Sequence, residues 1–170
     1  MSSRVLLRVK SGPRVGLGHI MRTRAVAEEL AALGATPLFV VDDEPSAEAL
    51  RAAGFEAQAA FAYPAWCHER AAGAWLDGFV DWSTELRALA RRGTPSFVVE
   101  NRTPCREWAN AVVYPALHHV PDRWDEVHAA RVLGGASWIP LSDAVRAQAQ
   151  VERDLDVLIT FGGADPLAST

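Results

Sequence analysis

Residues 4–34 read RVLLRVKSGPRVGLGHIMRTRAVAEELAALG, and this stretch decides the fold class. Residues 4–9 alternate and are rich in Val and Leu, and the Ser-Gly-Pro sequence at 11–13 breaks the pattern, which predicts a strand that runs into a loop. From His19 onward, apolar residues recur at helical spacing until Gly34, a residue that commonly ends a helix. The stretch therefore predicts a strand, a loop and a helix in that order.

The same alternation of strand and helix patterns continues along the chain. Further strands are predicted at residues 37–41, 55–59, 76–80, 96–100, 111–114, 131–133 and 155–161, and further helices at residues 46–53, 84–92 and 141–151. Strands that alternate with helices predict a Rossmann-like α/β fold, in which helices cover both faces of an open, mostly parallel sheet.

The length of the chain limits the number of domains. A chain of 170 residues is long enough for one α/β domain and too short for two. We expect residues 1–150 to form an N-terminal domain, and residues 151–170 to form a linker and the first strand and loop of a truncated second domain. The chain ends at Thr170, where a helix is expected to begin. The rest of that second domain is therefore expected to be missing or to belong to a separate partner.

Composition excludes several classes of protein. The 17 Lys and Arg against 21 Asp and Glu leave a formal net charge of -4, and no dense basic cluster indicates a nucleic-acid partner. Cys67 and Cys105 form no close pair in the sequence and no signal peptide is evident, which indicates a reducing cytoplasm. No apolar run approaches the roughly 20 residues that a transmembrane helix needs.

The loop before the first helix has the composition of a binding loop. Gly16 and Gly18 precede the helix and follow a strand, and ligands of open parallel sheets bind outside the carboxyl ends of the strands. A dinucleotide fingerprint would need a third glycine at the position of Met21, and a Walker-type site would need a Lys-Ser/Thr pair after the loop. The two glycines alone are weak evidence for a nucleotide.

His19 is the candidate catalytic residue of this loop. The N-terminal end of a helix favours neutral imidazole over imidazolium, which suits a general base. The alternative is an ordinary polar residue in the first turn of the helix, and spacing alone does not separate the two interpretations.

Several segments resemble a known family. The segments RVK at 8–10 and GLGHIMR at 16–22 resemble the opening of the UDP-sugar hydrolases of pseudaminic acid biosynthesis and the related spore-coat polysaccharide proteins. Residues 134–141 resemble the segment before the interdomain linker of these proteins, and TFGGADP at 160–166 resembles the start of their second domain. Residues 99–102 resemble a more acidic segment of the family only weakly.

The resemblance implies a GT-B-type enzyme in which two Rossmann-like domains face each other across a cleft. The second domain would bind UDP, and the first would present water to the anomeric carbon of a UDP-linked 2,4-diacetamido-trideoxy sugar. His19 would be the general base. Such a reaction would serve surface polysaccharide or nonulosonic acid biosynthesis, and no cofactor is expected for it.

Further site residues follow from the same resemblance. Contacts to the substrate are expected from Arg8, Lys10, Gly16, Gly18 and Arg22, and contacts to the nucleotide from Gly162, Gly163 and Asp165. We expect Arg8 to lie close to His19, although a solvated or salt-bridged side chain is the alternative for both arginines. Lys10 stands where the family usually has a carboxylate, and a cation cannot orient an imidazole as a carboxylate does.

Other interpretations stay open beside the hydrolase. The first alternative is a glycosyltransferase, in which the hydroxyl group of an acceptor takes the place of water in the same cleft. The second is that this chain is a non-catalytic sugar-binding half, which needs a separate nucleotide-binding partner. No metal site is expected, because neither Cys67-His68 nor His118-His119 has metal-ligand spacing. Trp66 and Trp75 are candidates for stacking on a sugar, with core packing as the alternative.

Overall fold

The computed structural model describes residues 3–15, 17–60, 65–68, 70–115 and 131–147. In these residues the strands are β1 (Arg4–Val9), β2 (Thr36–Val41), β3 (Glu56–Ala59), β4 (Gly73–Asp77), β5 (Ser96–Val99), β6 (Ala111–Tyr114) and β7 (Val132–Gly134). The α-helices are α1 (Gly18–Ala32), α2 (Glu44–Ala52), α3 (Ser83–Arg91) and α4 (Asp143–Ala147), and the short 3₁₀ helices are η1 (Ala65–His68), η2 (Pro104–Trp108) and η4 (Ala136–Trp138).

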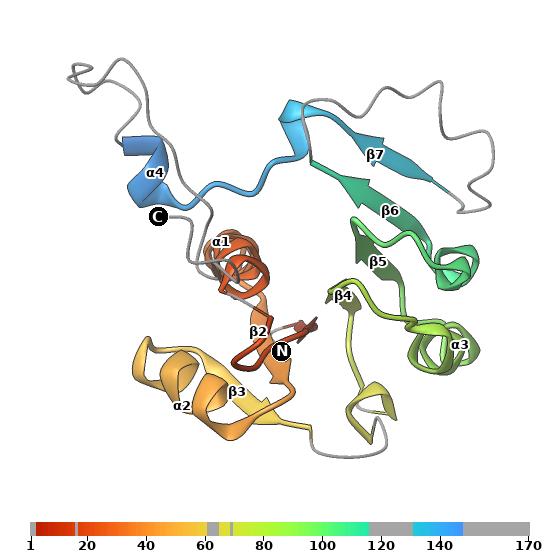
Figure 1. The fold of residues 1–170 in the computed structure, drawn as a ribbon, viewed down its shortest axis with the longest axis horizontal. Helices are drawn as coiled ribbons and strands as arrows, with labels where there is room; N and C mark the ends of the chain where they lie inside the picture. The colour runs from red at the N-terminus through yellow and green to blue at the C-terminus, as the bar shows by residue number, and fades with distance from the viewer. Residues whose placement is uncertain (1–2, 16, 61–64, 69, 116–130, 148–170) are drawn as a thin grey trace.

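The strands form one twisted sheet in the order β3-β2-β1-β4-β5-β6-β7 (Figure 1). Every neighbouring pair in this sheet is parallel. Because the strands are parallel, their carboxyl ends all lie at one edge of the sheet. The fold is therefore the open Rossmann-like α/β sheet that the sequence predicts.

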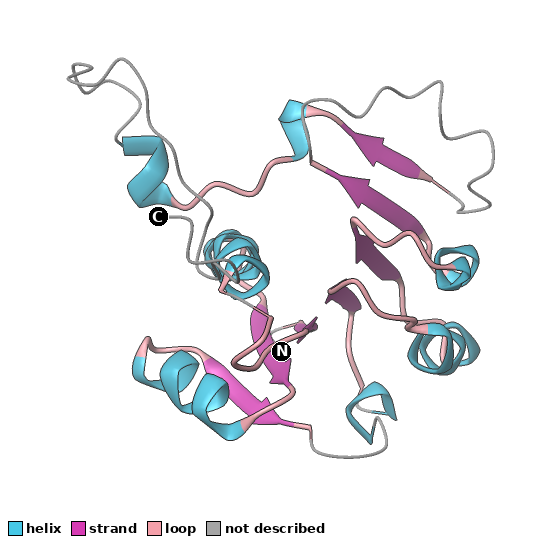
Figure 2. Cartoon of the chain, viewed as in Figure 1, coloured by secondary structure: helices cyan, strands magenta, loops and turns pink. Residues whose placement is uncertain are grey.

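Helices cover both faces of the sheet (Figure 2). On one face, α1 and α2 pack on alternate strand residues, with Leu7, Val9 and Phe39 among the buried side chains. On the other face, α3, η1 and η2 pack on the intervening residues, including Leu6 and Leu76. The two-residue alternation of a strand therefore decides on which face each side chain lies.

The first two helices begin differently. Asp43 caps α2, because its side chain accepts a hydrogen bond from the Ser46 amide at 2.9 Å. No described side chain caps α1, which begins at Gly18. The first amide groups of α1 are therefore not satisfied by a cap within the part of the chain that the structure describes.

The order of the strands reverses between β1 and β4. From β1 the chain builds outward through β2 to β3, and it then returns to place β4 on the other side of β1. Val9 and Asp77 are register partners at this seam, and the Lys10 amide donates to the Asp77 carbonyl oxygen at 2.8 Å. Ligands of doubly wound sheets bind at such a switch point, outside the carboxyl ends of the strands.

One predicted strand is misplaced. The strand expected at residues 76–80 is β4, which runs from Gly73 to Asp77. Gly73 already pairs with Val5, whereas Gly78 leaves the strand with a φ of 158°.

Of the helix expected at 141–151, the structure describes α4. The strand expected at 155–161 and the segment 151–170 that was assigned to a second domain lie outside the described residues. In the described ranges, no helix is long and apolar enough to span a membrane.

Candidate functional site

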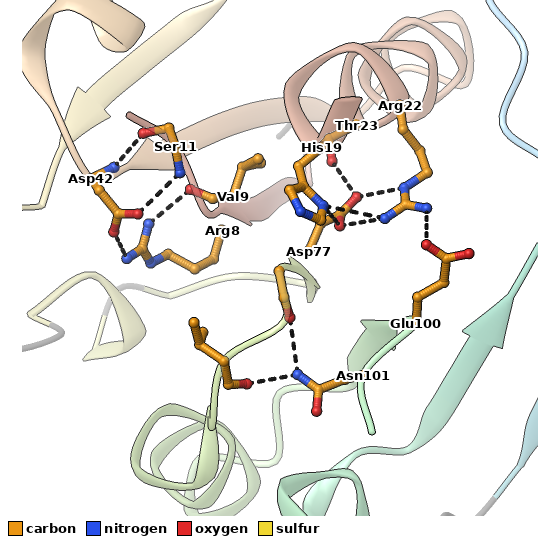
Figure 3. A network of polar contacts seen from close by, with 12 residues as sticks. Arg8, Val9, Ser11, His19, Arg22, Thr23, Asp42, Asp77, Glu100 and Asn101 are labelled. Atoms are coloured by element: carbon orange, nitrogen blue, oxygen red, sulfur yellow. Dashed lines mark hydrogen bonds and ion pairs between the residues drawn. The ribbon is translucent and has the colours of Figure 1, made fainter. Parts of the chain in front are cut away.

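A buried network of polar side chains lies at the switch point (Figure 3). His19, in the first turn of α1, is 9% exposed, and Asp77, at the end of β4, is fully buried. The His19 Nδ1 atom lies 2.7 Å from the Asp77 Oδ1 atom. Because a carboxylate oxygen only accepts, the proton between them is on Nδ1, and in the neutral ring the lone pair is then on Nε2.

The Asp77 carboxylate accepts hydrogen bonds on both oxygens. Oδ1 accepts from His19 and from Arg22 Nη2 at 2.7 Å, and Oδ2 accepts from Arg22 Nε at 2.8 Å and from Thr23 Oγ1 at 3.2 Å. Burial by itself would raise the pKa of Asp77, but the hydrogen bonds from His19 and Arg22 and the charge of Arg22 outweigh it and hold the pKa below its usual value. Asp77 is therefore a carboxylate at neutral pH although water does not reach it.

The lowered pKa of Asp77 makes a prediction about acid stability. A carboxyl group whose pKa is lower in the folded than in the unfolded protein stabilises the fold above its unfolded pKa, here about 3.8, and loses this contribution as the pH falls through the folded pKa. We expect the difference in unfolding free energy between wild type and Asp77→Asn to shrink as the pH falls below about 3.8. Urea titrations at several pH values below about 5 measure it. A difference that grows as the pH falls from about 4 toward about 2 would contradict the assignment.

Arg22 links this pair to a second carboxylate. Its Nη1 atom donates to Glu100 Oε2 at 2.5 Å, while Nε and Nη2 donate to Asp77. Burial alone would lower the pKa of Arg22, but hydrogen bonds and charges from Asp77 and Glu100 outweigh it and raise the pKa well above its usual range. Two carboxylates thus neutralise the guanidinium, and its orientation is fixed from both sides.

Glu100 follows β5 in a backbone conformation that is rare for it. Its φ is 46°, and no other described residue except glycine has a positive φ. The neighbouring Asn101 is fully buried and holds the turn, because its Nδ2 atom donates to the carbonyl oxygens of Gly78 at 3.0 Å and Val80 at 2.7 Å. The turn after β5 is thereby tied to the turn after β4, on which the position of Asp77 depends.

The His19 side chain, which is 11% exposed, lies at the carboxyl edge of the sheet. No described residue forms a hydrogen bond with Nε2, and the ring of Phe79 meets the imidazole edge to face, with centroids 5.0 Å apart. Phe79 itself is 66% exposed, so a largely exposed apolar ring lies beside the histidine. The arrangement provides a proton acceptor beside an apolar surface.

Arg8 does not belong to this network. Arg8 lies two residues after Leu6 in β1, so both side chains point to the face that α3 covers. There the Arg8 guanidinium lies 5.0 Å from the centre of the Trp82 ring. There it forms an ion pair with Asp42, and Lys10 Nζ lies 3.1 Å from the same carboxylate. The expectation that Arg8 lies close to His19 is wrong, because the two side chains lie on opposite faces of the sheet.

The predicted binding glycines fall into two groups. Gly16, Gly162 and Gly163 lie outside the described residues, as do Asp165, His118 and His119. Gly18 is described, and neither its φ nor its surroundings require glycine, because a Cβ atom there would meet nothing within 4 Å. At Gly78 glycine is required, because its φ is 158° and a Cβ atom there would lie 2.6 Å from the Lys10 Cβ atom.

This contrast predicts opposite outcomes for two matched substitutions. Gly18→Ala should leave the free energy of unfolding within about 0.5 kcal/mol of wild type, because alanine is the better helix former. Gly78→Ala should lower it by about 2 kcal/mol, because the new methyl group overlaps Lys10 and Trp82. Guanidinium denaturation of both variants tests this. Equal losses at both positions would contradict it.

Two other sets of candidates are part of the core. Trp66 is 4% exposed and packs in the cluster under α3, so core packing is its role, and Trp75 packs against the clusters of the α1 face. Cys67 and Cys105 are fully buried, and burial raises the pKa of both thiols. Among the residues described, no three His, Cys, Asp or Glu side chains form a group that could hold a metal ion.

A cavity of about 840 Å³ lies beside the network, between α1 and residues 139–145. Arg22 and Glu100 contribute to its wall, together with Arg24, Glu28 and Asp143. The remaining wall is largely apolar and includes Met21. The network therefore adjoins a space large enough for a small molecule.

Sequence reasoning missed Asp77 and Glu100, which complete the network. The available signal was that polar residues follow apolar strand patterns, at Leu76-Asp77-Gly78 and at Val99-Glu100-Asn101. Residues at these positions meet at the carboxyl edge of a parallel sheet.

Comparisons with known proteins add a structural likeness. No protein-family model matches the sequence, and neither does any curated protein. Among solved structures, the chain is similar to the NAD(P)-binding domain of an exopolyphosphatase-related protein from Archaeoglobus fulgidus. The identity is 18% and the TM-score 0.44, and the match covers 83% of this chain and 91% of that chain.

Proposed function

We propose that this chain is the acceptor-side half of a cytoplasmic two-domain enzyme that hydrolyses a UDP-linked amino sugar, with His19 as the general base. The observation that carries the proposal is the His19–Asp77 pair, buried at the switch point of the sheet with Nε2 open. The resemblance of GLGHIMR at 16–22 to UDP-sugar hydrolases of pseudaminic acid biosynthesis supports the choice of reaction.

The proposed chemistry follows from the orientation of the imidazole. Asp77 accepts the Nδ1 proton, so Nε2 takes a proton from water as the water oxygen bonds to the anomeric carbon. The bond from that carbon to the UDP oxygen breaks, and UDP leaves with the electron pair. Asp77 stabilises the imidazolium that forms, as a carboxylate does in other histidine-carboxylate pairs. Release of the proton to water restores the base.

The charges of the network support a neutral sugar and water on this side of the cleft. Asp77 and Glu100 neutralise Arg22, and Asp42 pairs with Arg8 and Lys10. None of these three cations is left without a carboxylate partner to bind a diphosphate. By resemblance, the diphosphate would lie against the second domain, near Gly162, Gly163 and Asp165. The product would enter surface polysaccharide or nonulosonic acid biosynthesis.

The test is incubation of the complete protein with a panel of UDP-linked acetamido sugars, without an added acceptor. Release of free sugar and UDP in equal amounts supports hydrolysis, and the His19→Ala variant controls for contaminating activity. Turnover that strictly requires an added acceptor would make the protein a glycosyltransferase. If no UDP-sugar reacts under either condition but the protein binds the free sugar, the result favours a non-catalytic sugar-binding half.

A further inference from the structure

Glu100 has one carboxylate oxygen that the network does not use. Oε2 accepts from Arg22 Nη1 at 2.5 Å, whereas no described residue donates to Oε1. The side chain is 22% exposed, and the residue lines the cavity of about 840 Å³ between α1 and residues 139–145. Glu100 therefore holds Arg22 with one oxygen, and its other oxygen has no donor among the described residues (Figure 3).

The backbone at Glu100 is in a conformation that is unfavourable for a residue with a Cβ atom. A left-handed φ of 46° costs a residue with a Cβ atom about 1 kcal/mol, which glycine would avoid. Asn101 and the hydrogen bond from the Glu100 amide to the Val113 carbonyl oxygen, at 2.9 Å, hold the strained turn in place. Strain of this kind is found where a side chain must be held in a functional position.

The wall of the cavity indicates the chemistry of its ligand. Two basic side chains, Arg22 and Arg24, and three acidic ones, Glu28, Glu100 and Asp143, line it, so the wall does not favour an anion. Exposed apolar side chains such as Met21, which is 53% exposed, add a surface for carbon atoms. A carboxylate beside an apolar wall fits a neutral group that carries N–H or O–H donors and a methyl group.

We propose that Glu100 is a specificity-determining residue, whose free oxygen accepts a hydrogen bond from an N–H or O–H group of a neutral sugar bound in this cavity. The inference rests on the proposed function for the kind of ligand. It extends that function by assigning substrate selection to Glu100, a residue that does not touch His19 in the network.

N-acetylglucosamine is a suitable probe, because it is neutral and carries both donors and a methyl group. The chain has two methionines, Met1 and Met21, so the Met21 methyl resonance of protein labelled with carbon-13 methionine reports on the cavity wall. Titration of wild type should move this resonance saturably. In Glu100→Gln the amide oxygen should turn to Arg22, so that an NH₂ group faces the donor of the sugar. The dissociation constant should rise about 10-fold or more.

Glu28→Gln is the matched control, because Glu28 lines the same cavity and forms no hydrogen bond or ion pair with the described residues of the network. It should bind N-acetylglucosamine as wild type does. Should Glu100→Gln not fold, Glu100→Asn keeps a residue that tolerates the left-handed backbone. The inference is overturned if the sugar leaves the Met21 resonance of wild type unmoved. It is also overturned if Glu100→Gln binds the sugar as tightly as Glu28→Gln does. Hydrolysis of UDP-sugars is measured separately, so binding with no turnover would remove the proposed reaction and keep the role of Glu100.

Discussion

Replacing Asp77 with asparagine is expected to lower the free energy of unfolding by about 3 kcal/mol. The substitution removes the only fully buried charge of the network and leaves Arg22, whose side chain is 18% exposed, with half of its compensation. Removing one partner of a buried ion pair typically costs about 3–5 kcal/mol. The low end of this range applies here, because Glu100 remains beside Arg22. Urea denaturation followed by circular dichroism at pH 7 measures the loss.

Two further variants separate charge from packing at Asp77. Thr23→Val removes one hydrogen bond of 3.2 Å to the same carboxylate without a change of charge, and it should cost about 1 kcal/mol. In the double variant Asp77→Asn with Arg22→Met, no uncompensated guanidinium remains, so the loss should be smaller than the sum of the two single losses. A loss below about 1 kcal/mol for Asp77→Asn, or strict additivity in the double variant, would contradict the central role of this ion pair.

Replacing His19 with alanine is expected to lower the turnover of the complete enzyme by at least about 100-fold without unfolding it. Nε2 is the proposed proton acceptor, and the other described side chains that donate to Asp77 are a guanidinium, Arg22, and a hydroxyl, Thr23, which are poorer bases than an imidazole. The fold should persist, because Asp77 keeps its hydrogen bonds from Arg22 and Thr23. Steady-state kinetics of UDP release, with the melting temperature as the check on folding, measures both effects.

Added imidazole gives a sharper control for His19. The alanine variant leaves space beside Asp77, and free imidazole in that space should restore part of the lost turnover. The variant Thr23→Val contacts the same carboxylate and should keep turnover within about threefold of wild type. Near-normal turnover of His19→Ala would remove this residue from the role of base, whatever the other variants do.

The sequence predicts the fold better than the site because local patterns determine most of the fold. Alternating apolar residues in β1 and helical spacing in α1 are local signals, and both elements lie where they were predicted, within a residue or two. The strand predicted at 76–80 shows the limit of such signals. A shift of three residues placed Asp77 inside a strand and hid that it stands at the carboxyl end of β4, where site residues are found.

The partners of His19 are distant in the sequence and therefore gave no local signal. Asp77 lies 58 residues after His19, and Glu100 lies 78 residues after Arg22. Lys10, at the position where the resembling family usually has a carboxylate, led to the expectation that no carboxylate orients the imidazole. In the structure that carboxylate comes from β4, and Lys10 pairs with Asp42 instead. Which strand lies beside β1 is a property of the sheet that periodicity does not contain.

The seam between β1 and β4 has a consequence for the breathing motions of the protein. The Lys10 amide crosses the seam to the Asp77 carbonyl oxygen, on the residue whose side chain holds His19. Exchange of this amide proton with solvent deuterium requires the seam to open, and the same opening separates the base from its carboxylate. The exchange rate of a single backbone amide thus reports how often the site comes apart in the native state.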